Sequence, residues 1–134
     1  MGDPLGAACY ARSKSTSDGW VILIEPSASD HVKDNMNPIG QLYYSFSTMG
    51  CVPTSKSQKV GLALGAQAGA KTLIELMSEA GFSDCNVVFK NATNMVNFCK
   101  AKNTHRRCNS SIKMNSLLRI ILSLIHISEP TRPY

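Results

Sequence analysis

The sequence has little of what defines the more specialised classes of protein. Only 17% of its 134 residues are charged, 7% are aromatic, and its five cysteines have no regular spacing. Because 43% of the residues are hydrophobic, a disordered polar chain is excluded, and five such cysteines are too few for a disulfide scaffold. The length suits one small domain and not two. We therefore expect an ordinary intracellular α/β or α+β domain.

Signals for metal binding, secretion and membrane insertion are also missing. No C-x-x-C pair occurs, so the cysteines are interpreted as structural thiols. His31, His105 and His126 lie far apart in the sequence and do not form a recognisable zinc-binding pattern. The N-terminus lacks a cationic start followed by an apolar core. The longest apolar stretch, Leu117–Ile127, is interrupted by polar residues and is shorter than the roughly 20 residues that span a bilayer. We predict no metal, no membrane partner and a cytoplasmic location.

The net charge of +5 belongs to the C-terminal tail. Residues 1–100 carry eight Lys or Arg and eight Asp or Glu, whereas the last 34 residues carry six Lys or Arg and a single acidic residue. A nucleic-acid interface needs its basic side chains on one face of a fold. We therefore predict no nucleic-acid partner. A basic peptide acting on membrane or nucleic acid through residues 103–127 remains an alternative.

The first half of the chain predicts a helix, a strand and a long polar connection. Asp3 and Pro4 are suited to cap and begin a helix that runs to Ala11. The run Trp20–Ile24 is continuous, apolar and rich in β-branched residues, which is typical of a strand buried on both faces of a parallel sheet. The polar composition of residues 27–60, with prolines in it, predicts short helices and ordered turns.

The second half predicts one helix and two strands. Apolar residues at helical spacing favour a helix over residues 70–81, with Gly81 as its left-handed cap and Phe82 packing back. Cys85–Lys90 and Met95–Lys100 are short apolar segments around a turn, which favours an antiparallel pair. This order of elements suggests one end of an α/β sandwich rather than a whole one.

The end of the chain does not have the pattern of a natural domain. The eleven residues Leu122–Arg132, LSLIHISEPTR, resemble the in-frame translation of a transposase-type sequencing adapter. Residues 103–116 have no apolar period, and the apolar run that follows them has no helix cap. The basic stretch 103–121 therefore resembles read-through of untranslated or intronic sequence. We therefore divide the chain into a native part, residues 1–102, and a non-native tail, residues 103–134.

Several segments of the native part share a resemblance to one family. They are GDPLGAA, GWVILIEP, DNMNPIGQLYYSFSTMGCVP, SQKVGLALGAQAGAKTL and EAGFSDC. Together they resemble the C-terminal part of class I S-adenosylmethionine-dependent methyltransferases, from a bacterial and invertebrate family with a winged-helix N-terminal domain. The resemblance implies a partial Rossmann-like fold: Met1–Pro4 follows the fourth strand, Trp20–Glu25 is the fifth, and the last two strands are the sixth and seventh.

This register implies that the half of the fold that holds the methyl donor is missing. In such folds a Gly-rich loop and an acidic residue bind the donor over the first two strands, and neither is present. Gly61, Gly65 and Gly69 do not have the G-x-G-x-x-G spacing and are interpreted as sites of turns or close packing. We expect the chain alone to bind no S-adenosylmethionine and to be inactive. The candidates for cofactor contact are Gly2, Asp3 and Glu25.

The resemblance implies that this chain contains the part of the fold that shapes the acceptor pocket. The long connection after the fifth strand crosses the carboxyl edge of the sheet, where ligands of open α/β sheets bind. The candidate residues of this small-molecule pocket are Asn35, Asn37, Tyr43, Tyr44, Ser47, Cys51 and Gln67. For the two tyrosines, the alternative is that one packs inward and the other lies at the surface. The acceptor itself is not determined by these residues.

Two titratable residues near that edge have more than one interpretation. His31 is the candidate general base, or a residue of the loop surface. A base is not obligatory, because the sulfonium charge activates the donor and placement of the acceptor supplies much of the catalysis. Glu25 has two functional interpretations, orienting an acceptor or contacting the donor. It has two structural ones as well, capping a helix or forming a salt bridge.

A hypothesis of a different class is a non-catalytic interaction module. An apolar first strand with an exposed edge favours association with a second chain, including self-association.

Overall fold

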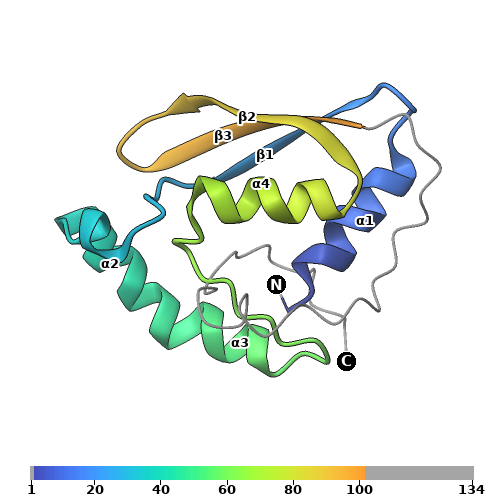
Figure 1. Ribbon diagram of the computed structural model, residues 1–134. Coiled ribbons are helices and arrows are strands. Elements are labelled where there is room, and N and C mark those ends of the chain that lie inside the picture. The colour runs from blue at the N-terminus through green and yellow to red at the C-terminus, as the bar shows by residue number, and fades with distance from the viewer. Residues whose placement is uncertain (1, 102–134) are drawn as a thin grey trace, which may run out of the picture.

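The computed structural model describes residues 2–101, which form a three-stranded sheet with its helices on one side (Figure 1). The elements in chain order are α1 (Pro4–Lys14), β1 (Trp20–Pro26), the 3-10 helix η1 (Val32–Asn35), α2 (Pro38–Phe46), the π-helix η2 (Ser47–Cys51), α3 (Val52–Lys56), α4 (Gly69–Glu79), β2 (Phe82–Lys90) and β3 (Asn94–Ala101). The mixed α/β composition and the short helices between β1 and α4 agree with the sequence analysis. The predicted tail, residues 103–134, lies outside the described residues.

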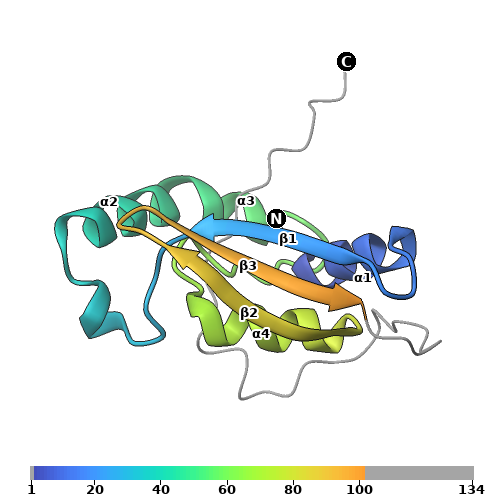
Figure 2. The ribbon, with the colours of Figure 1, turned by 90° about the horizontal axis from the view of Figure 1, so that it is seen from above.

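The sheet has the strand order β1-β3-β2 (Figure 2). β3 is antiparallel to both neighbours, so β1 and β2 run parallel to each other with β3 between them. The predicted antiparallel pair is confirmed, although β2 begins earlier than expected, at Phe82. The side chain of Asn91 forms the turn of this hairpin, because its Oδ1 accepts hydrogen bonds from the N–H groups of Thr93 (2.9 Å) and Asn94 (2.6 Å).

The prediction that the first strand is buried on both faces of a parallel sheet is wrong. The partner of β1 is the antiparallel strand β3, and its side chains alternate between covered and open positions. Val21 and Leu23 lie on the face that the helices cover. The residues of the opposite face are exposed: Trp20 by 57%, Ile22 by 57% and Ile24 by 64%. The reason is that α1 and α4 both pack on the same face, and no described helix lies over the other (Figures 1 and 2).

α1 begins where the sequence predicts. The Asp3 Oδ1 accepts a hydrogen bond of 2.7 Å from the Gly6 N–H, and Pro4 occupies the first turn, where its missing N–H costs nothing. The helix continues to Lys14, beyond the predicted end. It stops at Ser15, whose N–H donates to the carbonyl groups of the preceding turn.

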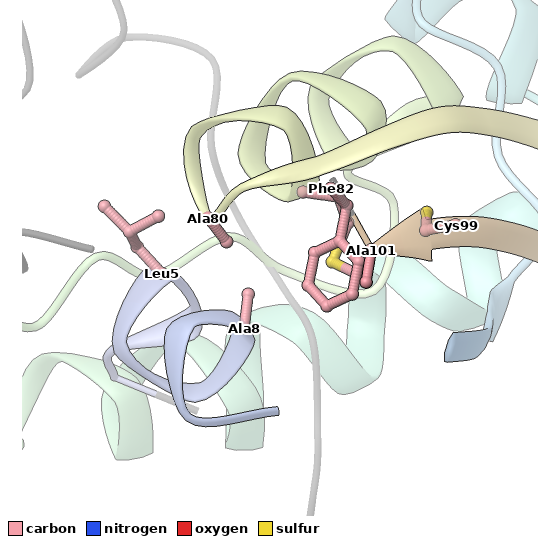
Figure 3. Close-up of a cluster of buried hydrophobic side chains, with 7 residues drawn as sticks. Leu5, Ala8, Ala80, Phe82, Cys99 and Ala101 are labelled. Atoms are coloured by element: carbon pink, nitrogen blue, oxygen red, sulfur yellow. The ribbon is translucent and has the colours of Figure 1, made fainter. Parts of the chain in front are cut away.

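α4 links the helix layer to the sheet through a cluster of buried side chains (Figure 3). The predicted helix is confirmed with slightly different ends, and Gly81 follows it with a φ of 93°, as a left-handed cap requires. Phe82 packs back against the helix and is almost completely buried, as predicted. The members of the cluster are Leu5 and Ala8 of α1, Met77 and Ala80 at the end of α4, and Phe82, Cys99 and Ala101 of the strands.

The Gly-rich stretch that leads into α4 is irregular and contains a turn at residues 66–67, in agreement with its interpretation from the sequence. Gly61, Gly65 and Gly69 all have positive φ angles, of 63°, 85° and 76°. A Cβ at Gly69 would also collide with the carboxylate of Asp30. Glycine is the residue that adopts these conformations without steric cost. This stretch brings Leu64 into a second buried cluster with Leu73 and Met95.

Among residues 2–101, the structure contains no helix of the length and apolar character needed to cross a membrane.

Candidate functional site

A cavity of about 250 Å³ lies at the carboxyl end of β1. Its walls come from the turn that follows β1, from η1 and the start of α2, from Gln67 in the loop before α4, and from the β2–β3 turn. Because β1 and β2 run parallel, their carboxyl ends meet at this edge of the sheet, where open α/β sheets bind their ligands. The long connection after β1 therefore closes over the edge that the sequence analysis singled out.

Asn35 fixes the first wall of the cavity. It is buried, its Oδ1 accepts a hydrogen bond of 2.7 Å from the Ser29 N–H, and its Nδ2 donates one of 2.9 Å to the Ser29 carbonyl oxygen. This pair of bonds folds residues 29–35 back on themselves. Since both ends of the amide are engaged in this way, Asn35 shapes the cavity.

Asn37 and Gly40 form the second wall. The Asn37 Oδ1 caps α2 by accepting a hydrogen bond of 2.9 Å from the Gly40 N–H, and Pro38 begins the helix. A Cβ at Gly40 would collide with the carbonyl oxygen of Asn35. Glycine therefore permits the close approach of η1 and α2 at the cavity.

Polar groups of three further residues complete the lining. The Lys90 Nζ donates a hydrogen bond of 3.2 Å to the Ala28 carbonyl oxygen and joins the end of β2 to the turn after β1. The Asp34 carboxylate is exposed and gives the lining a charge of opposite sign. Gln67 has a buried Oε1 without a hydrogen-bond partner among the described residues. An unpaired buried acceptor costs about 1–3 kcal/mol, so Gln67 is the wall residue that gains most from a donor brought close to it.

Glu25 is a buried carboxyl close to this edge but outside the lining. It lies near the end of β1, opposite Met95, on the helix-covered face, and is only 6% exposed. Burial raises the pKa of the Glu25 carboxyl from 4.5 to about 7. A carboxyl with this pKa exchanges protons at neutral pH, which is a property of general acids and bases.

The structure brings together only part of the predicted pocket. Asn35, Asn37 and Gln67 line the cavity, whereas the other candidates lie along the α2–η2 helix or before it and do not. His31 is exposed and precedes η1 without capping it through its side chain.

The remaining candidates have individual environments. Tyr43 and Tyr44 are both half-buried, which differs from the alternative in which one packs inward and the other lies at the surface. The Tyr43 hydroxyl donates to the Thr93 carbonyl oxygen at 3.1 Å. Ser47 is buried, and its Oγ accepts a hydrogen bond of 3.4 Å from the Ala66 N–H. Cys51 is a half-buried free thiol.

The predicted cofactor contacts at the N-terminus have structural partners. The Gly2 N–H donates to the Gln58 Oε1 at 2.6 Å, and the Gly2 carbonyl oxygen accepts a hydrogen bond of 2.9 Å from the Leu62 N–H. The Asp3 carboxylate caps α1. The two hydrogen bonds of Gly2 hold the start of the described chain against the connection between α3 and α4.

Sequence reasoning missed Lys90, Asp34 and the turn Ser27–Ser29, which all line the cavity. A signal for Lys90 was present, since it ends a predicted strand and is the one basic residue of that segment. Its meaning depended on knowing that β1 and β2 run parallel, which places the end of β2 beside the end of β1.

Within residues 2–101, the structure places no three His, Cys, Asp or Glu side chains where they could hold a metal ion together. Comparison of the chain with protein-family models and with curated proteins gives no match.

Proposed function

We propose that residues 2–101 are the C-terminal part of the catalytic domain of a class I S-adenosylmethionine-dependent methyltransferase, and that they form the wall of its site that faces the methyl acceptor. The observation that carries the proposal is the way in which α1, β1, α4 and β2 are connected on one face of the sheet.

The position of α1 implies a strand before it. Connections between parallel strands are right-handed in about 98% of cases, and α4 forms such a connection between β1 and β2. α1 packs on the same face as α4 and leads directly into β1. When two successive right-handed connections lie on the same face, each places its next strand further along the sheet in the same direction. A parallel strand that precedes α1 would therefore lie beside the edge of β1 that faces away from β3, where the resemblance expects the fourth strand.

Two further features support the same conclusion. Doubly wound domains have helices on both faces of the sheet, and here the face with Trp20, Ile22 and Ile24 is open and apolar. The last described strand, β3, is also inserted antiparallel between β1 and β2. This insertion suits the sixth and seventh strands of the family that the chain resembles.

The described residues do not fit the methyl donor. The Gly-rich stretch 61–69 has positive φ angles at its three glycines and packs against α4 through Leu64, and the backbone of Gly2 and the carboxylate of Asp3 are hydrogen-bonded within the fold. We therefore assign no methyl-transfer step to this chain alone. Its contribution is a cavity for a small acceptor at the carboxyl edge, shaped by Asn35 and Gly40.

Long-read sequencing of cDNA across both ends of the reading frame tests the proposal. We expect the transcript to extend upstream in frame into a strand followed by a Gly-rich loop, and to end near Lys102 without the adapter peptide. Calorimetry should then show binding of S-adenosylmethionine by the extended protein and none by the 134-residue chain. A transcript that starts at Met1, or tight binding by the 134-residue chain, would contradict the proposal.

The exposed strand supports a second candidate, a non-catalytic module that associates with itself. Within the described residues β1 pairs only with β3, so its other edge offers unpaired backbone groups beside exposed apolar side chains. Light scattering after size exclusion is expected to show a dimer that Ile24→Lys weakens. A monodisperse, cooperatively folded monomer counts against this candidate.

A further inference from the structure

Two free cysteines of β2 and β3 face each other at an irregularity of the sheet. Ser83 pairs with Lys100 and Asn86 pairs with Phe98, so the two intervening residues of β2, Asp84 and Cys85, oppose the single residue Cys99 of β3. This is a β-bulge. Asp84 occupies its first position with a φ of 51°, and Cys85 is turned toward the core cluster that contains Cys99.

The two side chains are neighbours. Cys85 packs against the buried cluster to which Cys99 belongs, and neither sulfur atom is in a disulfide bond. Opposed residues of antiparallel strands have Cα atoms about 4.5–5.5 Å apart. Disulfides need a Cα separation of about 4.4–6.8 Å, so opposed residues of neighbouring strands lie within the range that a disulfide spans.

The two cysteines differ in their access to solvent. Cys99 is fully buried, whereas Cys85 is half-buried, at the margin of the cluster. A dissolved oxidant therefore meets Cys85 first, and Cys99 is the nearest thiol that can react with the product.

We propose that Cys85 and Cys99 are a redox-sensitive pair, which a hydroperoxide converts into an intramolecular disulfide. In the first step the Cys85 sulfur takes one oxygen atom from hydrogen peroxide, which gives a sulfenic acid and one water. In the second step the Cys99 sulfur attacks the Cys85 sulfur, the S–S bond forms, and the hydroxyl group leaves with the thiol proton as a second water. Two thiols lose two electrons in total, and one peroxide is reduced to two waters.

The surroundings of the two thiols slow their oxidation, so we expect the disulfide to form only on prolonged exposure to the oxidant. Burial raises the pKa of both thiols, and the Asp84 carboxylate adds to the rise at Cys85. The thiolate, which is the reactive form, is therefore scarce at neutral pH. The pair also lies at the end of β2 remote from Lys90 and the cavity, so the inference does not depend on the proposed function.

Peptide mapping of the oxidised 134-residue chain tests the inference directly. Cleavage after Lys71, Lys90 and Lys100 places Cys85 in the peptide Thr72–Lys90 and Cys99 in Asn91–Lys100. After treatment of the folded chain with hydrogen peroxide and blocking of remaining thiols, mass spectrometry is expected to show these two peptides linked, with loss of two hydrogens. The link should be at least about tenfold more abundant than any link to Cys51, and it should disappear after reduction.

Two comparisons keep the test decisive. The Cys51→Ser variant should retain the link, and a urea-unfolded sample should lose the preference for Cys99 over the other thiols. The inference is overturned if Cys85 and Cys99 both remain open to alkylation after oxidation. It is also overturned if Cys85 accumulates as the sulfinic or sulfonic acid without a link, or if links to Cys51 are equally abundant in the folded chain.

Discussion

The strongest prediction for stability concerns Asn97, in the middle of β3. Its side chain is completely buried, and neither its Oδ1 nor its Nδ2 has a hydrogen-bond partner among the described residues. The cross-strand neighbours of Asn97 are Leu23 on β1 and Val87 on β2, which offer no polar side-chain atoms. A polar group in this position lowers stability, because folding removes its hydrogen bonds to water and does not replace them.

Asn97→Leu is therefore expected to stabilise the protein. Removal of unsatisfied buried groups relieves about 1–3 kcal/mol. Burial of a leucine side chain contributes about 1.5–3 kcal/mol, whereas fitting the larger leucine side chain into the packed core costs about 1–3 kcal/mol. We expect a net gain of about 2 kcal/mol in the free energy of unfolding, which corresponds to a rise of about 10 °C in Tm for a domain of this size.

Urea unfolding followed by circular dichroism measures this change. Asn97→Asp is the matched control, for which we expect a change of opposite sign in the free energy of unfolding, since the new side chain has nearly the same shape but places a carboxylate in the same site. It should destabilise the protein at pH 7 and do so less at pH 4, where the carboxyl can take up a proton. A loss of more than about 1 kcal/mol in Asn97→Leu would refute the reasoning, because it would mean that the amide has partners.

Three further predictions follow from burial and backbone geometry. The pKa of Glu25 is higher in the folded chain than in the unfolded chain, so stability should fall as the pH rises from about 4.5 through 7, by up to about 3 kcal/mol in total. Glu25→Gln should abolish that fall in urea titrations at pH 5 and pH 8, and an unchanged pH dependence would contradict this cause. Ala63 has a φ of 53°, so Ala63→Gly should raise the free energy of unfolding by about 1 kcal/mol, whereas Gly65→Ala, at a φ of 85°, should lower it by at least as much; equal effects would argue against backbone strain. Ile24 lies on the open face of β1, so Ile24→Lys should change thermal stability by less than about 1 kcal/mol, while Leu23→Lys on the covered face should cost more than about 3 kcal/mol. Similar losses in both variants would mean that the open face is covered in solution.

The candidate site was only partly open to prediction. Its expected location at the carboxyl end of the first strand came from the family resemblance together with the general behaviour of open α/β sheets, and three of the predicted residues, Asn35, Asn37 and Gln67, do line the cavity. Lys90 escaped notice because its neighbour in space, Ala28, is 62 positions away in sequence. Glu25 was noticed as a strand-end carboxyl, but its raised pKa depends on the packing around it.

The sequence by itself determined the elements whose causes are local. The Asp3 cap, the apolar period before Gly81 and the Asn91 turn each act within a few residues, so α1, α4 and the β2–β3 hairpin were predictable from short patterns. Only the tertiary structure decided what depends on partners far along the chain. Ile22 and Leu23 are both apolar members of one strand, yet the first is exposed and the second is covered, because α1 and α4 pack on one face alone. The same distant packing buries Asn97 and brings Cys85 to Cys99, and no pattern along the sequence contains that information.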